Sequence, residues 1–220
     1  MVQELSFALF DFDNTLAKGD SIVPFLMYCI RHGQAPWYQV FKALHGFLEQ
    51  KRCPEKISTA KGRTLSFLKG KQQEDVQALA RRFWQESLSK RVYAAGVAEM
   101  KKLKAEGYYI LVVSASPSAY MDVLPEFLPV DGVISTVCGV DECGRYNGLV
   151  GENCKELQKP LRIAEYLAAH HLVLDPKHSR AYGDSKSDAP MLSLVASPFV
   201  VNGNKDLQAM VPSATVVNWR

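Results

Sequence analysis

The 220-residue sequence contains few cysteines, and their number is odd. They are Cys29, Cys53, Cys138, Cys143 and Cys154. Because they are widely spaced in a chain long enough to fold without cross-links, we expect reduced thiols rather than a disulfide framework. The last three form a loose cluster, but four residues separate Cys138 from Cys143 and no histidine follows before His170. This spacing favours ordinary buried or loop thiols over a structural zinc site.

The sequence also lacks a long hydrophobic run. Its longest uncharged apolar stretch near the start, residues 21–30 (SIVPFLMYCI), is about half the length that a bilayer-spanning helix needs. The first ten residues carry Glu4 and no basic patch, so they do not resemble an export signal. We therefore expect no transmembrane segment and a cytoplasmic location. The apolar content of 47% excludes general disorder and permits a sizeable core.

Charge is distributed unevenly along the chain. Residues 18–91 contain 14 Lys or Arg and 6 Asp or Glu, a net charge of +8, whereas the whole chain carries only +3. Such a segment suits an anionic substrate, an anionic membrane surface or nucleic acid, or it is a solvated helical surface rich in lysine. The segment contains no recognisable groove-reading motif, so we expect no nucleic-acid partner.

Outside that segment, short apolar runs alternate with helical patterns. Residues 6–10 (SFALF) and 108–113 (YYILVV) read as buried strands, and further strands are expected within residues 133–137, 179–185 and 198–202. Helices are expected over residues 100–106, after Pro117 and over 161–170, where Pro160 takes the first helical position and Lys159 the N-cap. Residues 141–148 suit a hairpin. This alternation predicts an α/β fold with a parallel sheet covered by helices on both faces.

The basic segment itself predicts several helices and no strand. Pro54 suits a helix start, and Val76, Leu79 and Phe83 recur at helical spacing. We therefore predict a helical domain over residues 18–91, inserted into an α/β core domain of residues 1–17 and 92–220. Hinges are expected near residues 17–20 and 94–96.

Polar residues follow three of the predicted strands: Asp11, Ser114 and Asp184. Ligands of open α/β sheets bind outside the carboxyl ends of the strands, so these side chains should converge at one edge. Asp11 and Asp13 would share a face if the strand continued. Carboxylate oxygens are the ligands that Mg²⁺ prefers, and one Asp can act as nucleophile while the other acts as general acid and base. Lys159, at a helix N-terminus, suits contact with an anion.

Three motifs carry a family resemblance. DFDNTL (residues 11–16) resembles motif I of the haloacid dehalogenase superfamily, LVVSAS (111–116) its motif II, and GDSKSDAPML (183–192) its motif IV. Their order, with a helical segment between motifs I and II, resembles the phosphoserine phosphatase-like subclass IB. The resemblance implies a Rossmann-like parallel sheet with a helical C1 cap inserted between the first two motifs, and a Mg²⁺-dependent phosphatase.

The resemblance also implies roles for individual residues. Asp11 would be nucleophile and metal ligand, and Asp13 would be the acid and base whose main-chain carbonyl binds the metal. Lys159 would be the motif III lysine, with Lys155 as the alternative. The other implied positions are Ser114, Ala115 and Asp20 at the substrate and Asp184 and Asp188 at the metal. Carboxylate ligands suit Mn²⁺ as well as Mg²⁺.

The substrate is less closely specified. We expect hydrolysis of a small anionic phosphorylated metabolite through an aspartyl phosphate; transfer to an acceptor other than water would begin in the same way. The family's phosphoserine enzymes carry a Glu where this chain has Asp20, which also suits a helix N-cap. A phospholipid head group is an alternative substrate, and a non-catalytic phosphate-binding protein of the same fold is a further alternative.

The aromatic stretch in the basic segment bears on that choice. Trp37, Tyr38, Phe41 and Phe47 suit contact with a membrane surface, but the interior of a helical bundle needs such residues too. The second interpretation is the one we expect. The sequence leaves the oligomeric state open.

Overall fold

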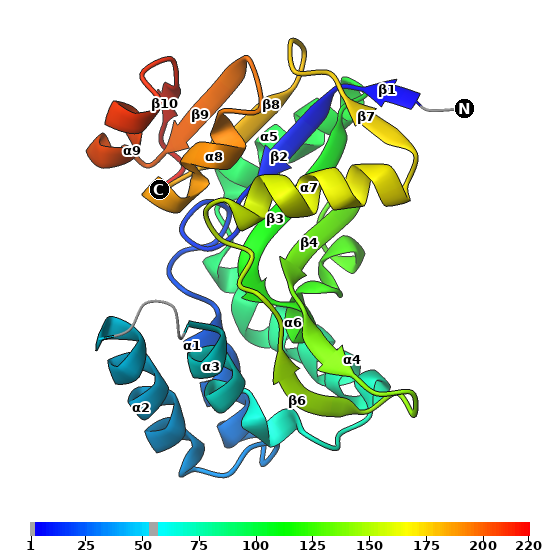
Figure 1. Cartoon of the computed structure of the whole chain (residues 1–220), viewed down its shortest axis with the longest axis vertical. Coiled ribbons are helices and arrows are strands. Elements are labelled where there is room, and N and C mark those ends of the chain that lie inside the picture. Colours follow the sequence, from blue (N-terminus) through cyan, green and yellow to red (C-terminus); the bar gives the residue numbers. More distant parts are fainter. Residues whose placement is uncertain (1–2, 53–56) are drawn as a thin grey trace.

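The computed structural model describes residues 3–52 and 57–220, and it has a sheet at one end and a group of helices at the other (Figure 1). Six strands form a parallel sheet in the order β10-β9-β8-β2-β3-β4. They are β2 (Phe7–Phe10), β3 (Tyr109–Pro117), β4 (Gly132–Thr136), β8 (Arg180–Gly183), β9 (Ser197–Val201) and β10 (Thr215–Val217). A separate parallel pair joins β1 (Gln3–Leu5) to β7 (Leu172–Leu174). The predicted α/β fold class is confirmed.

Helices cover both faces of the sheet, as the sequence predicts. They are α5 (Ala94–Ala105), α6 (Ser118–Met121), α7 (Gln158–Ala169), α8 (Ala189–Leu192) and α9 (Lys205–Met210). In β2, Phe10 belongs to a buried cluster with Met100 of α5, whereas its neighbour Leu9 belongs to a second cluster with Ile163 of α7. Successive side chains of β2 therefore pack into the clusters on opposite faces of the sheet. Because both faces are buried, every residue of the strand is apolar.

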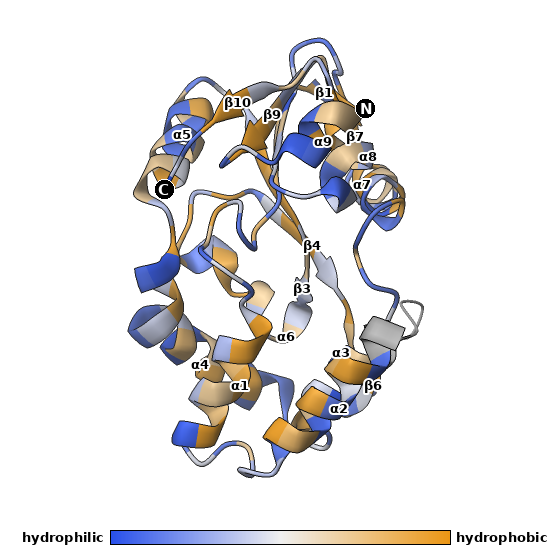
Figure 2. Cartoon of the chain, turned by 90° about the vertical axis from the view of Figure 1, so that its left-hand side faces the viewer, coloured by the Kyte–Doolittle hydropathy of each residue, from blue (hydrophilic) through white to orange (hydrophobic). Residues whose placement is uncertain are grey.

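The chain between β2 and β3 is helical. It forms α1 (Ile22–Arg31), α2 (Gln39–Arg52), α3 (Ile57–Thr64) and α4 (Gln73–Phe83), followed by a π-helical turn, Trp84–Leu88. Figure 2 shows α1 and α4 on one side of this helical part and α2 and α3 on the other. In α4, Val76, Leu79 and Phe83 are buried, as their spacing predicts. Pro54 lies outside the described residues.

A hairpin from the second half of the chain joins the helical part. The strands β5 (Cys138–Val140) and β6 (Tyr146–Val150) are antiparallel, where the sequence predicts a hairpin. The main chain of Tyr146 accepts a hydrogen bond from Gly70 N (2.8 Å) and donates one to Lys71 O (3.0 Å). The domain limits at residues 17, 18, 91 and 92 remain a prediction, but the helical part has contacts from outside residues 18–91.

Several predicted boundaries are wrong. The helix expected over 100–106 begins at Ala94, because Ala94 and Ala95 are strong helix formers. The hinge expected at 94–96 would therefore lie in the first turn of α5, and it stays a prediction. The strand expected to end at residue 113 continues through Ser114. Lys159 is not an N-cap but lies inside α7, which begins at Gln158. No helix among the described residues is long and apolar enough to cross a membrane.

A prediction concerns the packing of the helical part. Phe83 is fully buried, and its ring contacts those of Phe25 on α1 (5.2 Å between centroids) and Tyr120 on α6 (5.9 Å). We expect Phe83→Ala to lower the free energy of unfolding by about 3–5 kcal/mol, because it leaves a cavity among these rings. Phe41→Ala removes the same atoms from an exposed position of α2 and should change it by less than about 0.5 kcal/mol. Equal losses in urea unfolding would contradict the packing described here.

Candidate active site

Polar residues gather where the central strands end. Asp11 follows β2 directly, Asp184 follows β8, and Ser114 lies in β3, which pairs with β2. Adjacent parallel strands end at the same edge of a sheet, so the fold brings these three distant residues together, as the sequence predicts. A loop over residues 11–17 follows β2, with Asn14 in the left-handed region (φ 63°), which asparagine tolerates better than most residues.

A buried lysine lies between two of the carboxylates. Lys159 Nζ donates to Asp11 Oδ1 (2.6 Å) and to Asp188 Oδ1 (2.7 Å), and only 1% of the lysine is exposed. Burial would by itself lower the pKa of Lys159, but the charges of Asp11 and Asp188 raise it above its ordinary value. The lysine is therefore a permanent cation, and it ties the end of β2 to α7 and to the turn after β8.

The turn after β8 is built around Asp188. Its Oδ2 accepts hydrogen bonds from Asp184 N (3.2 Å), Ser185 N (3.0 Å) and Ser185 Oγ (3.0 Å). Thr15 Oγ1 from the loop after β2 donates to Asp184 Oδ1 (3.2 Å). A Cβ at Gly183 would lie 2.5 Å from Cβ of Asp188, so only glycine fits there. The GDSxSD motif thus fixes the direction of both carboxylates.

Three carboxylates here suit a divalent cation. Asp11, Asp184 and Asp188 each offer an oxygen within 4.8 Å of the others, and among the described residues this is the one group of possible metal ligands found. Lys159 balances one of the three charges. Burial, partly opposed by Lys159, raises the pKa of Asp11 to about 6, and burial with the charges of Asp11 and Asp188 raises the pKa of Asp184 to about 7. A hard divalent cation would offset the repulsion between these carboxylates and favour their ionised form, so the residues fit Mg²⁺.

The second Asp of DFDNTL has different surroundings. Asp13 Oδ2 accepts from Ser116 Oγ (2.5 Å), and Ser116 Oγ in turn contacts Ser21 Oγ (2.9 Å) at the N-cap of α1. The other oxygen, Oδ1, is buried with no hydrogen-bond partner. Burial and the nearby charge of Asp20 raise the pKa of Asp13 to about 7. Asp13 is therefore outside the group of three, and its predicted main-chain contact with a metal remains a prediction.

Strand β3 is irregular at motif II. The pairing of β3 with β4 shifts register between Val113 and Pro117, which releases the carbonyl of Ala115 from the ladder. Ser114 is buried, and its Oγ accepts from Ser116 N (3.0 Å), so its own hydroxyl hydrogen points elsewhere. The Ala115 carbonyl accepts from Thr136 Oγ1 (2.6 Å) and from Lys61 Nζ.

Lys61 is a site residue that the sequence reasoning missed. It lies on α3, and its ammonium also donates to Asn153 Oδ1, so it reaches from the helical part to the sheet. Burial lowers its pKa to about 8, although the charges of Asp20 and Asp13 oppose this. A lysine inside a basic helix carries no local signal of such a role; only a fold that places α3 over motif II reveals it.

Two other residues considered for the site, Asp20 and Lys155, are exposed. Asp20 Oδ1 accepts from Ile22 N (2.9 Å), in the first residue of α1. The N-cap of α1 is Ser21, so the N-cap position that the sequence allowed for Asp20 is wrong by one residue. Lys155, the alternative to Lys159, is exposed, whereas Lys159 contacts Asp11.

Four cysteines carry free thiols, of which Cys29, Cys138 and Cys154 are buried and Cys143 is exposed; Cys53 lies outside the described residues.

Comparison with known proteins agrees with this geometry. The family model of the haloacid dehalogenase-like hydrolases matches residues 8–193, which include every position described above. The chain belongs to this family. The resemblance predicted from the three motifs is confirmed, and with it the expectation of an enzyme of the hydrolase class.

Relatives of this haloacid dehalogenase-like hydrolase include named phosphatases. A phosphoserine phosphatase of Mycobacterium tuberculosis is 27% identical over 92% of this chain and 67% of its own length. A histidinol-phosphatase of Neisseria meningitidis is 25% identical over 91% of this chain and 92% of its own. Both names agree with the phosphatase class that the motifs predict.

Solved structures share the fold. A protein of unknown function from Bordetella pertussis has a TM-score of 0.86 and 23% identity, with both chains fully covered. A phosphoserine phosphatase solved with an analogue of its phospho-aspartyl intermediate has a TM-score of 0.64 and 19% identity over 99% of this chain and 95% of that one. At these identities the likeness concerns the fold.

A prediction separates Lys159 from Lys155. Lys159→Met leaves Asp11 and Asp188 buried without their cation, so we expect the free energy of unfolding to fall by about 3–5 kcal/mol in buffer with EDTA. Lys155→Met changes an exposed residue and should alter it by less than about 0.5 kcal/mol. Urea unfolding of both variants measures this. A larger loss in the Lys155 variant would refute the assignment.

Proposed function

We propose that this hydrolase is a Mg²⁺-dependent phosphomonoesterase that acts through an acyl phosphate formed on its own Asp11 (an aspartyl phosphate). The observation that carries the proposal is the difference in surroundings between two carboxylates, Asp11 and Asp13, that lie two residues apart. Asp11 is bonded to a permanent cation, whereas Asp13 is bonded to a serine and has one buried oxygen without a partner. Two carboxylates in such different surroundings suit a nucleophile and a proton carrier.

In the first half-reaction, an oxygen of Asp11 attacks the phosphorus atom and the ester oxygen leaves with the bonding electrons. Asp13, whose pKa of about 7 keeps a substantial fraction protonated at neutral pH, gives its proton to the departing oxygen. We assign the hydroxyl of Ser114 and the ammonium of Lys159 to hold the oxygens of the transferred group, because the first is buried in β3 beside motif I and the second contacts Asp11. The product alcohol is then released, and Asp11 carries the phosphoryl group.

In the second half-reaction, Asp13 takes a proton from a water molecule, and the water oxygen attacks the phosphorus atom. The bond to Asp11 breaks, inorganic phosphate leaves, and both carboxylates return to their first state. The unpartnered Oδ1 of Asp13 is the atom that we assign to this proton, because a buried acceptor without a partner is rare in folded proteins.

We propose that Mg²⁺ is held by Asp11, Asp184 and Asp188. Asp188 accepts a hydrogen bond from Asp184 N and shares Lys159 with Asp11. The ion would supply positive charge to the phosphate oxygens and to the three carboxylates. The fit rests on the charge balance described above, in which one ammonium contacts two buried carboxylates and a third, half-buried carboxylate lies beside them.

We propose a small anionic metabolite as the substrate, with the helical segment of residues 18–91 as a cap over the site. Lys61 supports this because its ammonium lies at motif II and its charge acts on Asp13 and Asp20. A group that replaced the Ala115 carbonyl or Asn153 as its partner would be an acceptor, and an anion would be preferred. The phosphoserine and histidinol phosphate named for relatives are therefore the first compounds to try.

A prediction tests the two roles. With Mg²⁺ and a panel of phosphomonoesters, including a phosphorylated lipid head group, Asp11→Asn should release no phosphate above background. Asp13→Asn should lose about a hundredfold to ten-thousandfold in kcat, the usual contribution of general acid and base catalysis. Asp75→Asn, an exposed position of α4, should keep wild-type turnover.

A second prediction identifies the intermediate. With p-nitrophenyl phosphate, whose leaving group needs no proton, Asp13→Asn should still complete the first half-reaction and then stall. We expect its mass to increase by one phosphoryl group, which maps to Asp11. Wild-type turnover in Asp13→Asn, or phosphate on another residue, would refute the division of roles.

A further inference from the structure

Helix α2 presents its apolar residues to solvent and its small and polar residues to the protein. Toward the protein it places Gln39, Ala43 and Gly46, spaced four and three residues apart. The Gln39 side-chain amide donates to Thr64 O (3.1 Å) and Ser66 Oγ (2.9 Å), and a Cβ on Gly46 would lie 3.0 Å from Cα of Ala60. The helix is therefore held closely against α3 by residues that bury little apolar surface.

The opposite face carries a continuous apolar stripe. We call it the outer face of α2; it comprises Trp37 and Tyr38 in the turn just before the helix and Val40, Phe41, Leu44 and Leu48 on the helix. Trp37 is 71% exposed, Phe41 61% and Leu44 52%. Positions 37, 41, 44 and 48 recur at helical spacing, the pattern that normally faces a core. The expectation that these aromatic residues fill the interior of the helical bundle is therefore wrong.

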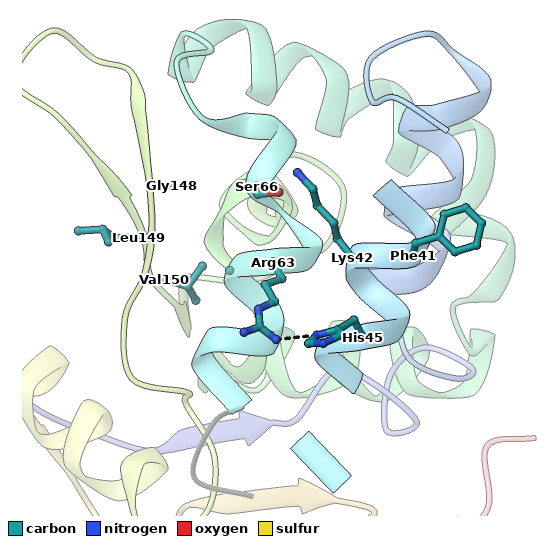
Figure 3. Close-up of a pocket in the computed structure, with 9 residues that line it drawn as sticks. Phe41, Lys42, His45, Arg63, Ser66, Gly148, Leu149 and Val150 are labelled. Carbon is teal, nitrogen blue, oxygen red and sulfur yellow. Dashed lines mark hydrogen bonds between the residues drawn. The ribbon is translucent and has the colours of Figure 1, made fainter. Parts of the chain in front are cut away.

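Exposed apolar side chains are common singly, but a stripe of this kind marks an interaction surface. Two basic side chains lie beside it, and the charge of one of them, Arg63, is balanced by Glu49. Lys42 lies over the ring of Tyr38 (5.7 Å from Nζ to the centroid), and Arg63 contacts His45 (2.9 Å) and Glu49. Figure 3 shows these cations beside a cavity of about 830 Å³ between α2, α3 and β6, with Phe41 pointing away from β6. No carboxylate of the active site lines that cavity.

We propose that the outer face of α2 docks on an anionic lipid bilayer. Tryptophan and tyrosine are the side chains that favour the boundary between water and lipid, and an amphipathic helix with basic neighbours binds there in the plane of the surface. Charge selects this occupant over a second copy of the chain. Two copies meeting through α2 would bring together two segments of net charge +8, whereas an anionic bilayer is complementary to one.

The arrangement of the molecule permits this docking. In Figures 1 and 2, α2 and α3 lie at the end of the molecule away from β9 and β10, so a surface can meet α2 without meeting the sheet. The proposal is independent of the proposed reaction, because membrane binding is read without turnover. Docking would bring the site close to substrates at the surface of the bilayer, but it does not determine which compound is hydrolysed.

The test is sedimentation of the full chain with two kinds of vesicle: phosphatidylcholine alone, and phosphatidylcholine with about a third phosphatidylserine. We expect binding to the anionic vesicles, and weaker binding as NaCl rises from about 0.1 to about 1 M and shortens the Debye length. Trp37→Ala combined with Phe41→Ala should lower the partition coefficient by about tenfold or more. Lys42→Ala should lower it by about fivefold on anionic vesicles only.

Matched variants control for folding and for general stickiness. Leu161→Ala with Met210→Ala removes exposed apolar atoms elsewhere, and Lys155→Ala removes an exposed lysine elsewhere; neither should change the partition coefficient. Thermal unfolding checks that all variants fold. The proposal is overturned if wild type binds neither vesicle at low salt, or if the α2 and control variants bind equally. It is also overturned if light scattering detects a stable dimer that the α2 double variant abolishes, because a second copy then covers this face.

Discussion

The salt bridges of Lys159 are the interaction on which the rest of this structure depends. One ammonium joins the end of the central strand, through Asp11, to the turn after β8, through Asp188, and all three side chains are buried. Burying a lysine or a carboxylate alone is costly, so each of these groups can be buried only because the others are there. The pairing therefore ties the first turn of α7 to the end of β2. Gly183 lies so close to Asp188 that no side chain fits there.

The same charges show that the negative charge of the site is not fully compensated by the protein. Lys159 balances one carboxylate of three, and the pKa values of Asp11 and Asp184 rise in consequence of burial that nothing in the chain fully offsets. Asp13 keeps a buried oxygen without a partner. A fold selected for stability alone would replace such groups with apolar ones. Their presence together at one sheet edge is a cost that a bound cation would offset, because it supplies the positive charge that the carboxylates lack.

The sequence predicted the sheet and the acidic edge well, because both depend on local signals. A short apolar run that ends at Asp11 or Asp184 marks a buried strand and its carboxyl end, whatever else the chain does. What it could not predict depends on contacts between distant segments. Lys61 resembles any lysine of a basic helix until α3 is placed over Ala115, and the apolar stripe of α2 has the periodicity of a core helix. Periodicity shows that a helix has an apolar face, but not what that face meets.

The two halves of the helical part thus obey different constraints. α1 and α4 pack by burying aromatic rings such as Phe25 and Phe83, and they join the core through Tyr120. α2 and α3 pack through glycine, alanine and a glutamine amide, which leaves large side chains outside and one cation, Lys61, reaching the site. Glycine, alanine and an amide contribute less buried apolar surface than aromatic rings do. The Lys61 bonds to Ala115 and Asn153 therefore have a particular weight in this half of the helical part, because they join α3 to motif II.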